Sequence, residues 1–293
     1  MSTQPKVYFI TGCSSGLGYS LAKAAIAAGH KVIATSRNPS KTPDKVAEIT
    51  SLGGIWAALD VASPSLESQF RDKILPLANG KIDVLINNAA IGGGTIIEDI
   101  EIDLARSIFE TNVWGVIRLS KLLVPLMRAQ GGGSIVQISS TTAVYPLPTI
   151  SMYAASKAAL DAFTIALAAE VAHLNIRVLI TTPAGIRTPF IENSSAASQD
   201  ALTELRPEYK GSAAEALIKM VQDPAGLKID PDRAATVVVQ AVDGTGPFKD
   251  KGSEFLRLPL GEDTLNMLQG RIGEMSEAVK NFSDVAKSVE FEA

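Results

Sequence analysis

Tyr153 and Lys157 could do acid–base chemistry together, because they lie four residues apart in an alanine-rich stretch. The run from Ala154 to Ala172 contains no proline or glycine, and Ser151 can cap it, so the sequence predicts a helix here. Residues four apart share one helix face, so the phenol and the ammonium can reach the same spot. A cation beside a tyrosine favours the phenolate and lowers the phenol pKa from about 10 towards neutrality. An ordinary exposed helix surface is the alternative, and the surrounding motifs decide between the two.

A glycine-rich turn near the start of the chain could bind an anion. Lys6 to Thr11 predicts a short buried strand, and the run Tyr19 to Ala28 predicts a helix directly after the turn. Free backbone N–H groups and the dipole at a helix N-terminus favour a pyrophosphate, and glycine lets the backbone approach it closely. An ordinary tight turn is the alternative, but the order strand, turn, helix favours a dinucleotide site. The turn residues expected at this site are Gly12, Ser14, Ser15, Gly16, Leu17 and Gly18.

The end of the second predicted strand, Lys31 to Ser36, bears on which dinucleotide binds. In a dinucleotide-binding fold, an acid at this position binds the 2′-hydroxyl of the adenosine ribose. Here the neutral Ser36 is followed by Arg37, and a guanidinium can bind a 2′-phosphate through paired charge-assisted hydrogen bonds. The sequence therefore favours NADP(H) over NAD(H). A solvated surface position for Arg37 is the alternative, and the glycine turn itself holds no second basic residue.

Strands and helices alternate along the chain, and the strands are too continuously apolar to be half exposed. The later predicted strands are Ile55 to Leu59, Val84 to Ile86, Ile135 to Ile138 and Arg177 to Ile180. This pattern predicts an α/β fold: a single Rossmann-type domain with one doubly wound parallel sheet and helices on both faces. Ligands bind at the carboxyl ends of such strands, so Asp60 and Asn87 are expected on the adenosine side, and Ser139 and Ser140 stand at the same edge.

The predicted helix from Leu104 to Gln130 contains Asn112. Asparagine is a poor residue for a helix interior, because its amide competes for backbone hydrogen bonds. We therefore expect a kink or a bound water at this position, with plain solvent exposure as the alternative.

The last third of the chain departs from the alternation. Residues 189–228 predict a lid-like excursion, and Asp230 to Val242 predicts a helix with proline in its first turn. Phe255 to Leu260 predicts the last strand, so the core spans about residues 6–260. An apolar stripe at alternating spacings of three and four follows: Leu265, Leu268, Ile272, Met275, Val279 and Phe282. The stripe predicts a helical tail over about residues 262–293 that packs on its own domain, with a subunit contact or a wall over the active site as alternatives.

Composition restricts the classes of partner. The 293 residues are 46% hydrophobic, and the net charge of −4 comes from well-mixed acids and bases, so no basic face for nucleic acid is indicated. No stretch has the apolar length needed to span a bilayer. The single Cys13 excludes an internal disulfide and fits a reducing compartment, so we expect a cytoplasmic protein. His30 and His173 lack companions at metal-ligand spacing, so no metal site is predicted and helix-end or surface positions are expected for both.

Taken together, these motifs resemble the short-chain dehydrogenase/reductase family over about residues 6–260. The matching motifs are Thr11-Gly12-x-x-x-Gly16-x-Gly18, Asn87-Asn88-Ala89-Ala90 and Tyr153-x-x-x-Lys157. Ala90 and Ala184 replace glycines that the family commonly has, so the loop that holds the nicotinamide can follow a different path. The family commonly forms homo-oligomers, through the helices that here hold Asn112 and Tyr153.

The resemblance implies hydride transfer to or from a nicotinamide, with Tyr153 as the acid–base. It implies that Lys157 also holds the nicotinamide ribose and that Asn112 anchors a water in a proton relay. Ser140 falls thirteen positions before Tyr153, as in the family, and would orient the substrate oxygen. The further cofactor contacts that it implies are Val61, Ala89, Pro183, Ile186 and Thr188.

The side chains expected around the substrate are mostly apolar and carry few charges. They are Ile91, Thr141, Thr142, Tyr145, Pro146, Leu147 and Phe190. Such a lining favours a hydrophobic, neutral ketone or secondary alcohol. We therefore expect an NADP(H)-dependent carbonyl reductase or alcohol dehydrogenase. The alternatives are an epimerase that uses a transient ketone and a non-catalytic NADP(H) sensor, although such sensors typically lack the tyrosine or the lysine.

Overall fold

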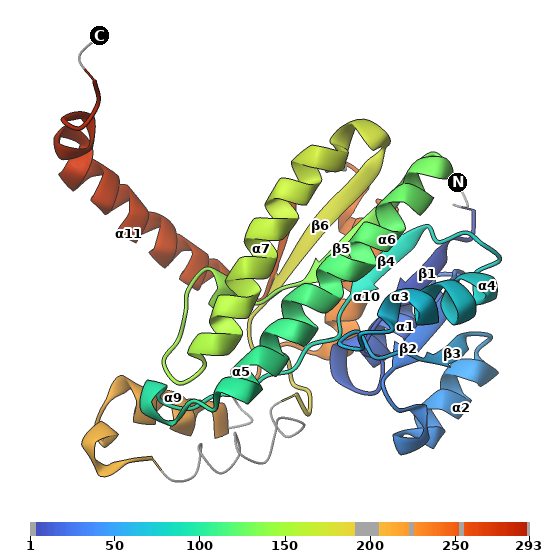
Figure 1. Ribbon diagram of the computed structural model, residues 1–293, viewed down its shortest axis with the longest axis horizontal. Helices are drawn as coiled ribbons and strands as arrows, with labels where there is room; N and C mark the ends of the chain where they lie inside the picture. The colour runs from blue at the N-terminus through green and yellow to red at the C-terminus, as the bar shows by residue number, and fades with distance from the viewer. Residues whose placement is uncertain (1–3, 191–204, 223–225, 252–254, 292–293) are drawn as a thin grey trace.

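The computed structural model describes residues 4–190, 205–222, 226–251 and 255–291 (Figure 1). Its centre is a seven-stranded sheet in the order β3-β2-β1-β4-β5-β6-β7, in which every neighbouring pair is parallel. The strands are β1 (Val7–Ile10), β2 (Lys31–Ser36), β3 (Ile55–Ala58), β4 (Val84–Asn87), β5 (Gly133–Ile138), β6 (Ile176–Pro183) and β7 (Arg257–Leu260). The order reverses between β1 and β4, and in sheets of this kind ligands bind at such a switch point, at the carboxyl ends of the strands. The predicted doubly wound parallel sheet is confirmed.

Helices lie in the connections between these strands, and a last helix follows β7. They are α1 (Gly16–Ala27), α2 (Pro43–Ser51), α3 (Leu66–Gln69), α4 (Leu75–Leu77), α5 (Ile102–Phe109), α6 (Gly115–Ala129), α7 (Ser151–Val171), α9 (Ala213–Gln222), α10 (Pro231–Asp243) and α11 (Glu262–Lys287). Within the described part of the chain, none of these helices combines the length and the apolar character that crossing a membrane requires.

The helices lie in two layers, one on each face of the sheet. Successive side chains of a strand point to opposite faces, so Tyr8 and Ile10 pack with α1 and α10, whereas Phe9 packs on the other face with α6 and α7. The same alternation in β4 places Ile86 on the face covered by α1 and α10 and Leu85 on the face covered by α6 and α7. Figure 1 shows α6 and α7 side by side across one face of the sheet. Because both faces are covered, the strands are apolar throughout, as the sequence indicates.

Two helical segments are interrupted by π-helical turns. At Asn112, where we expected a kink or a bound water, α5 and α6 are joined by the π-helical turn η4 (Glu110–Trp114). A second π-helical turn, η2 (Phe70–Ile74), joins α3 to α4 and was not expected from the sequence. Such turns leave the regular i to i−4 bonding pattern and are frequent at functional sites.

Part of the predicted lid-like excursion over residues 189–228 lies outside the described residues, so its movement stays a prediction. Its described part contains η7 (Pro207–Tyr209) and α9. Arg206 donates to the carboxylate of Asp99 at 2.8 Å, and Tyr209 donates to Glu98 at 2.6 Å. These contacts fasten the excursion to η3 (Ile97–Asp99), which follows β4 in the chain.

The tail helix α11 corrects an expectation, because it does not pack on its own domain along most of its length. Figure 1 shows it projecting away from the body of the protein. Among the described residues, the hydrogen bonds and ion pairs that fasten it lie in its first turn: Thr264 is buried and donates to the Leu260 carbonyl at 2.6 Å, and Lys228 pairs with Asp263 at 3.0 Å. The amphipathic stripe is helical as predicted, but its apolar side faces solvent.

The amino-terminal edge of the sheet holds a buried ion-pair cluster around Asp243, the last residue of α10. Its carboxylate accepts from Lys6 at 2.9 Å, from Tyr8 at 3.0 Å, and lies 2.7 Å from His30 Nε2. His30 follows α1, as expected for a helix-end residue, but it is buried rather than at the surface. The cluster ties both ends of the first βα unit to α10.

Candidate active site

Tyr153 and Lys157 lie on the first turns of α7, at the carboxyl edge of the sheet. Lys157 is buried, and its Nζ donates to the Ile138 carbonyl at the end of β5 at 2.7 Å. The same nitrogen lies 5.8 Å from the centre of the Tyr153 ring. The phenol of Tyr153 takes part in a hydrogen bond with Ser140, and its ring packs against Phe190 with centroids 5.7 Å apart. The pair is therefore not an ordinary helix surface.

Burial changes the acidity of both groups. It raises the pKa of Tyr153 to about 12, and the hydrogen bond with Ser140 opposes this increase. It lowers the pKa of Lys157 to about 8, and the negative charge of Asp161 opposes this decrease. The expected lowering of the tyrosine pKa is therefore wrong for the protein by itself, because the cost of desolvating the phenolate exceeds the favourable effect of the hydrogen bond with Ser140.

The two adjacent serines have different partners. Ser140 Oγ accepts from the Thr142 N–H at 3.2 Å and from the Thr142 hydroxyl at 2.9 Å, and it also contacts Tyr153. Ser139 instead donates to Asp161 at 2.5 Å. The second oxygen of Asp161 pairs with Arg257 of β7 at 2.7 Å. Sequence reasoning missed Asp161 and Arg257, although an acid one helical turn after a lysine was a signal that could have identified the first.

Asn112 holds the loop around Ile91, which follows β4. Its Oδ1 accepts from the Ile91 N–H at 2.9 Å, and its Nδ2 donates to the Ile91 carbonyl and to Ser156 Oγ, each at 3.0 Å. Ser156 in turn donates to the backbone carbonyl of Tyr153 at 2.7 Å. Asn112 is fully buried, so solvent exposure is excluded. Both amide hydrogens have protein partners, which leaves only an acceptor on this side chain for a water.

The glycine turn approaches other backbone so closely that side chains would not fit. Gly12 and Gly16 have φ of 71° and 55°, a conformation that side chains disfavour. A Cβ on Gly18 would lie 2.3 Å from both the Gly12 carbonyl oxygen and Asn88 Nδ2. Asn88 donates to the carbonyls of Thr11 and Gly12 at 2.9 and 3.0 Å, so it clamps the turn to β4.

Other residues expected at the cofactor site surround this turn. Thr188 is adjacent to Gly16, since a Cβ built on Gly16 would lie 2.9 Å from that of Thr188. Ala89 donates its N–H to Thr11 Oγ1 at 3.0 Å. Leu17 is a buried residue of the first turn of α1, Pro183 ends β6, and Ile186 forms a bridge with Ile229. Ser15 is the residue before α1 and Ser14 precedes it, so both lie at the helix N-terminus.

The adenosine side carries both neutral and basic groups. Ser36 is buried and accepts from Trp56 Nε1 at 3.1 Å, whereas Arg37 is exposed. Lys45 of α2 donates to the Ser14 carbonyl at 3.0 Å, so a second cation reaches the glycine turn. Sequence reasoning missed Lys45 because only the packing of α2 brings it there.

Asn87 is the polar residue of this edge that best fits a bound group. It is buried, and neither its Oδ1 nor its Nδ2 has a hydrogen-bond partner among the described residues. A buried amide without partners carries a free-energy cost that a ligand can remove. Asp60 differs, because its Oδ1 accepts from the Ala62 N–H at 3.0 Å and forms a turn, while Val61 next to it is buried. The residues present therefore fit a dinucleotide that crosses the switch point between β1 and β4.

Of the residues expected around the substrate, the structure brings only some to Tyr153. Phe190 contacts its ring, and Ile91 is held by Asn112. Thr141 is buried and donates to the Pro183 carbonyl at 2.8 Å, so it supports β6 rather than lining a pocket. A small cavity of about 50 Å³ lies between the first turn of α7, at Ser151 and Met152, and helix α5.

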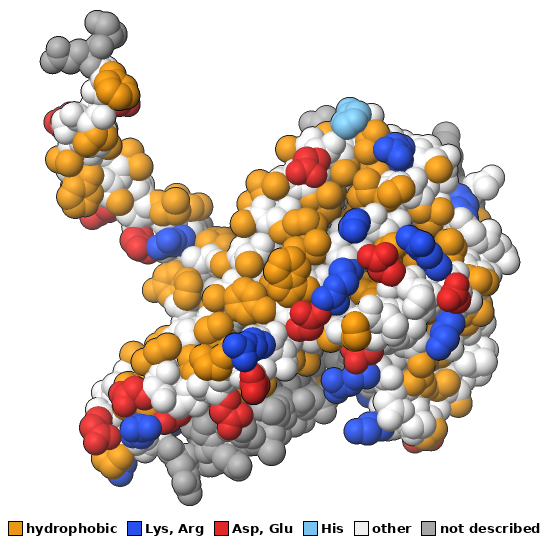
Figure 2. Space-filling model, in the orientation of Figure 1, with side chains coloured by type: hydrophobic (Ala, Val, Ile, Leu, Met, Phe, Trp, Pro, Cys, Tyr) orange, Lys and Arg blue, Asp and Glu red, His pale blue; other side chains and the backbone are white. Residues whose placement is uncertain are grey.

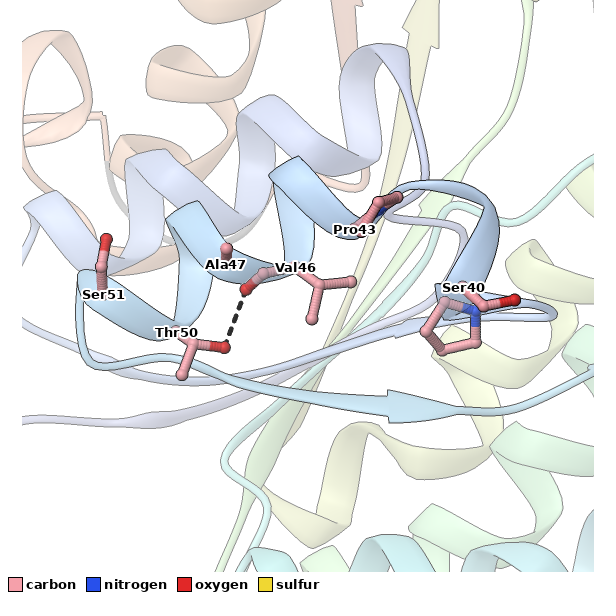
Figure 3. Close-up of a pocket in the computed structure, with 7 residues that line it drawn as sticks. Ser40, Pro43, Val46, Ala47, Thr50 and Ser51 are labelled. Carbon is pink, nitrogen blue, oxygen red and sulfur yellow. Dashed lines mark hydrogen bonds between the residues drawn. The ribbon is translucent and has the colours of Figure 1, made fainter.

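An open hollow elsewhere is not part of this site. It lies on the outer side of α2, next to the edge strand β3 (Figure 3). Its lining is small and uncharged: Pro39, Ser40, Pro43, Val46, Ala47, Thr50 and Ser51. The Thr50 hydroxyl donates to the Val46 carbonyl of its own helix at 2.8 Å, so the hollow presents little polar chemistry.

The fold and this edge define a Rossmann-type oxidoreductase, and comparison with known proteins agrees. Residues 6–199 match the family model described as short chain dehydrogenase. The chain is 32% identical over 277 residues to the oxidoreductase BOA17 of Botryotinia fuckeliana, covering 93% of this chain and 94% of that protein. The protein belongs to the short-chain dehydrogenase/reductase family.

Two solved structures show the same architecture. A short-chain dehydrogenase from Streptomyces avermitilis superposes with a TM-score of 0.85 at 32% identity, covering 98% of this chain and all of that one. The 3-ketoacyl-(acyl-carrier-protein) reductase from Brucella melitensis, solved in complex with NADH, has a TM-score of 0.69 at 26% identity, covering 87% of this chain and 96% of that one.

Proposed function

We propose that this protein is an NADP(H)-dependent oxidoreductase that transfers a hydride to or from a hydrophobic ketone or secondary alcohol. The observation that carries the proposal is the joint position of Tyr153, Lys157 and Ser140 at the same edge of the sheet as the glycine turn. The phenol has a hydrogen bond with Ser140, and the buried ammonium lies 5.8 Å from its ring. Family membership supports the oxidoreductase class.

The nicotinamide would supply or accept the hydride when it is bound, and the residues of this chain would handle the proton. Tyr153 would donate its phenolic proton to the substrate oxygen during reduction and remove it during oxidation. Ser140 can donate a hydrogen bond to the same oxygen and so orient it. Lys157 has a pKa of about 8, so it is mostly a cation at pH 7, and positive charge beside Tyr153 favours the phenolate.

Three residues support a preference for NADP(H). Ser36 is neutral and buried, so the acid that usually binds the 2′-hydroxyl of NAD(H) is missing at this strand end. Arg37 follows it and is exposed, and Lys45 reaches the carbonyl of Ser14. Two cations near the end of β2 favour a 2′-phosphate. The Brucella reductase has this fold and is in complex with NADH, so the preference for NADP(H) is argued from these residues and not from the fold.

The substrate class is argued from the side chains near Tyr153. The ring of Phe190 covers one side of the phenol. The small cavity beside α7 is bordered by Leu104 and Ile108 of α5, and also by Asp99 and Glu101. The apolar ring against the phenol favours a hydrophobic carbonyl compound over a sugar or a charged acid. The name of the Brucella reductase, which acts on a ketone of an acyl chain, agrees with that class.

The proposal is tested by NADPH oxidation with a panel of hydrophobic ketones. Tyr153→Phe should bind NADPH almost normally and lose roughly 100- to 10,000-fold in turnover, because a positioned acid–base contributes about that factor. Tyr19→Phe, which removes a phenol that donates to Glu48 away from this site, is the matched control and should stay active. Wild-type rates in Tyr153→Phe would refute the mechanism, and binding without turnover of any ketone or alcohol would favour the sensor.

Cofactor choice is tested by fluorescence titration of NADPH and NADH. Arg37→Leu should weaken NADPH binding by about 10- to 100-fold, the factor for one charge-assisted hydrogen bond, and leave NADH binding unchanged. Lys45→Met should act in the same direction. Lys31→Met, at the opposite end of β2, is the control and should change neither affinity. Tighter binding of NADH than NADPH to the wild-type protein would overturn the preference.

A further inference from the structure

The tail helix α11 exposes a continuous apolar stripe. From Ile272 to Phe282 every side chain of the helix is exposed, and the exposed fraction is 67% for Ile272, 69% for Val279 and 61% for Phe282. Figure 2 shows hydrophobic side chains along the projecting helix. Its 26 residues correspond to a rod about 39 Å long, of which only the first turns contact the body. Scattered exposed apolar residues are ordinary, but an ordered stripe on one helix face marks an interaction surface.

The spacing of this stripe identifies the kind of partner. Two apolar series repeat at intervals of seven residues: Leu265, Ile272 and Val279, and between them Leu268, Met275 and Phe282. A repeat averaging 3.5 residues keeps the stripe facing one partner helix only if the two helices wind around each other in a left-handed coiled coil. β-Branched residues in the first series, here Ile272 and Val279, favour a parallel two-stranded pair.

The helix also needs an external partner for its own stability. It contains Gly270 and Gly273, and each glycine in a helix interior is unfavourable relative to alanine. Beyond the first turns it has no tertiary packing among the described residues, and isolated helices are marginal in water. Packing along the stripe would supply the missing stabilisation.

The charges on α11 argue against a membrane surface as that partner. The helix carries five acidic and three basic residues: Glu262, Asp263, Glu274, Glu277, Asp284, Arg271, Lys280 and Lys287. A helix that lies on an anionic membrane is rich in lysine and arginine on its polar face. Glu277 and Asp284 lie on the side opposite the stripe, so this face would repel anionic lipid.

We propose that the exposed stripe of α11 pairs with the same stripe of a second copy of this chain, forming a parallel two-stranded coiled coil. A second copy presents the complementary surface by symmetry, because identical positions face one another across a two-fold axis. The pairing would also hold the first turns of α11, whose Gly270 lies near Tyr145 at the edge of the active site.

Cysteine cross-linking of the full chain tests the register directly. The chain has one natural cysteine, Cys13, which is buried and cannot interfere. In a parallel pair the two copies of residue 279 face each other, so Val279→Cys should form a disulfide-linked dimer on mild oxidation. Glu277→Cys, on the opposite side of the helix, is the matched control and should remain a monomer on a non-reducing gel. Failure of Val279→Cys to cross-link, or equal cross-linking of both variants, would overturn the proposal.

Sedimentation equilibrium tests independently whether the partner of the α11 stripe is a second copy of this chain. The double variant Ile272→Asp with Val279→Asp should have half the mass of the wild-type assembly, and Glu277→Gln with Lys280→Gln should retain the full mass. An unchanged thermal midpoint would show that the core of the double variant is folded. Equal masses for the double variant and the wild type would overturn the proposal, as would co-sedimentation of the wild type with phosphatidylserine vesicles.

Discussion

Lys157 and Asp161 lie one helical turn apart on α7, both buried, and the carboxylate partly restores the charge that burial removes from the lysine. Burial lowers the pKa of Lys157 to about 8, while the negative charge of Asp161 raises it. Asp161 is held by Ser139 at 2.5 Å and by Arg257 at 2.7 Å. Asp161 therefore affects the candidate site by raising the pKa of Lys157, without touching Tyr153.

We predict that Asp161→Asn makes the enzyme more sensitive to alkaline pH. Without the carboxylate the pKa of Lys157 falls further below about 8, so the ammonium loses its proton at lower pH. The alkaline limb of the kcat/KM profile should move to lower pH, with activity reduced near pH 8 and close to normal near pH 6. The measurement is the pH dependence of kcat/KM, which reports groups of the free enzyme.

The matched control is Ser139→Ala, which removes one hydrogen bond to Asp161 but keeps its charge. This variant should leave the alkaline limb in place even if it lowers stability. Equal shifts in both variants would mean that the effect is structural, and no shift in Asp161→Asn would show that Lys157 does not set the limb.

The local motifs of the site could be predicted, but their supporting contacts could not. The glycine turn, the strand ends and the helix irregularity at Asn112 follow from short-range rules of backbone geometry and hydrogen bonding. The partners of Asp161 could not be found this way, because Arg257 lies 96 residues away on β7. Lys45 is likewise brought to Ser14 only by the packing of α2.

Two other expectations depended on competing free energies. The pattern alone gave no measure of how strongly burial would oppose ionisation of Tyr153, so the direction of its pKa change was wrong. For α11, periodicity predicts an apolar face but does not say which surface covers it. The structure gives the direction of the pKa change of Tyr153. It also shows that, beyond the first turns of α11, the rest of the domain does not pack against the apolar face of this helix.

A substitution at Gly18 should disrupt the cofactor turn. In Gly18→Ala the new methyl would lie 2.3 Å from both the Gly12 carbonyl oxygen and Asn88 Nδ2, so the turn or the clamp must move. We expect loss of dinucleotide binding, measured by NADPH fluorescence, and a lower thermal midpoint. Gly273→Ala is the control: it also replaces a helical glycine, has open space around it and should gain up to about 1 kcal/mol. Normal NADPH binding by Gly18→Ala would contradict the assigned turn.

Removing the Asn112 side chain should destabilise the loop at Ile91 and reduce turnover. Asn112→Ala leaves the Ile91 N–H and carbonyl without their partners, and each such loss costs about 1–3 kcal/mol when the group stays buried. We expect roughly 2–4 kcal/mol less stability in urea unfolding. Ser156→Ala loses one bond from Asn112 and one to the Tyr153 carbonyl, keeps both contacts of Ile91, and should cost about 1–2 kcal/mol. Equal effects of the two variants would mean that the Ile91 contacts contribute little.

The cluster at the other edge of the sheet should control acid stability. Burial raises the pKa of Asp243, but hydrogen bonds from Lys6 and His30 outweigh it and hold the pKa below its usual value. A carboxyl with a depressed pKa in the folded state contributes stability above its unfolded pKa of about 3.9, and the contribution is lost as pH falls through the folded value. Asp243→Asn should therefore lower the free energy of unfolding by about 3 kcal/mol at pH 7, since it removes the buried charge that pairs with the half-buried Lys6.

The difference between wild type and Asp243→Asn should begin to shrink as the pH falls below the unfolded pKa of about 3.9, because the unfolded wild-type carboxyl takes up a proton before the folded one does. Urea unfolding at pH 7, 5 and 3.5 measures it. Asp250→Asn, which changes an exposed acid shortly after the same helix, is the control and should match wild type at every pH. A difference that is constant with pH would show that Asp243 contributes through packing, not through its charge.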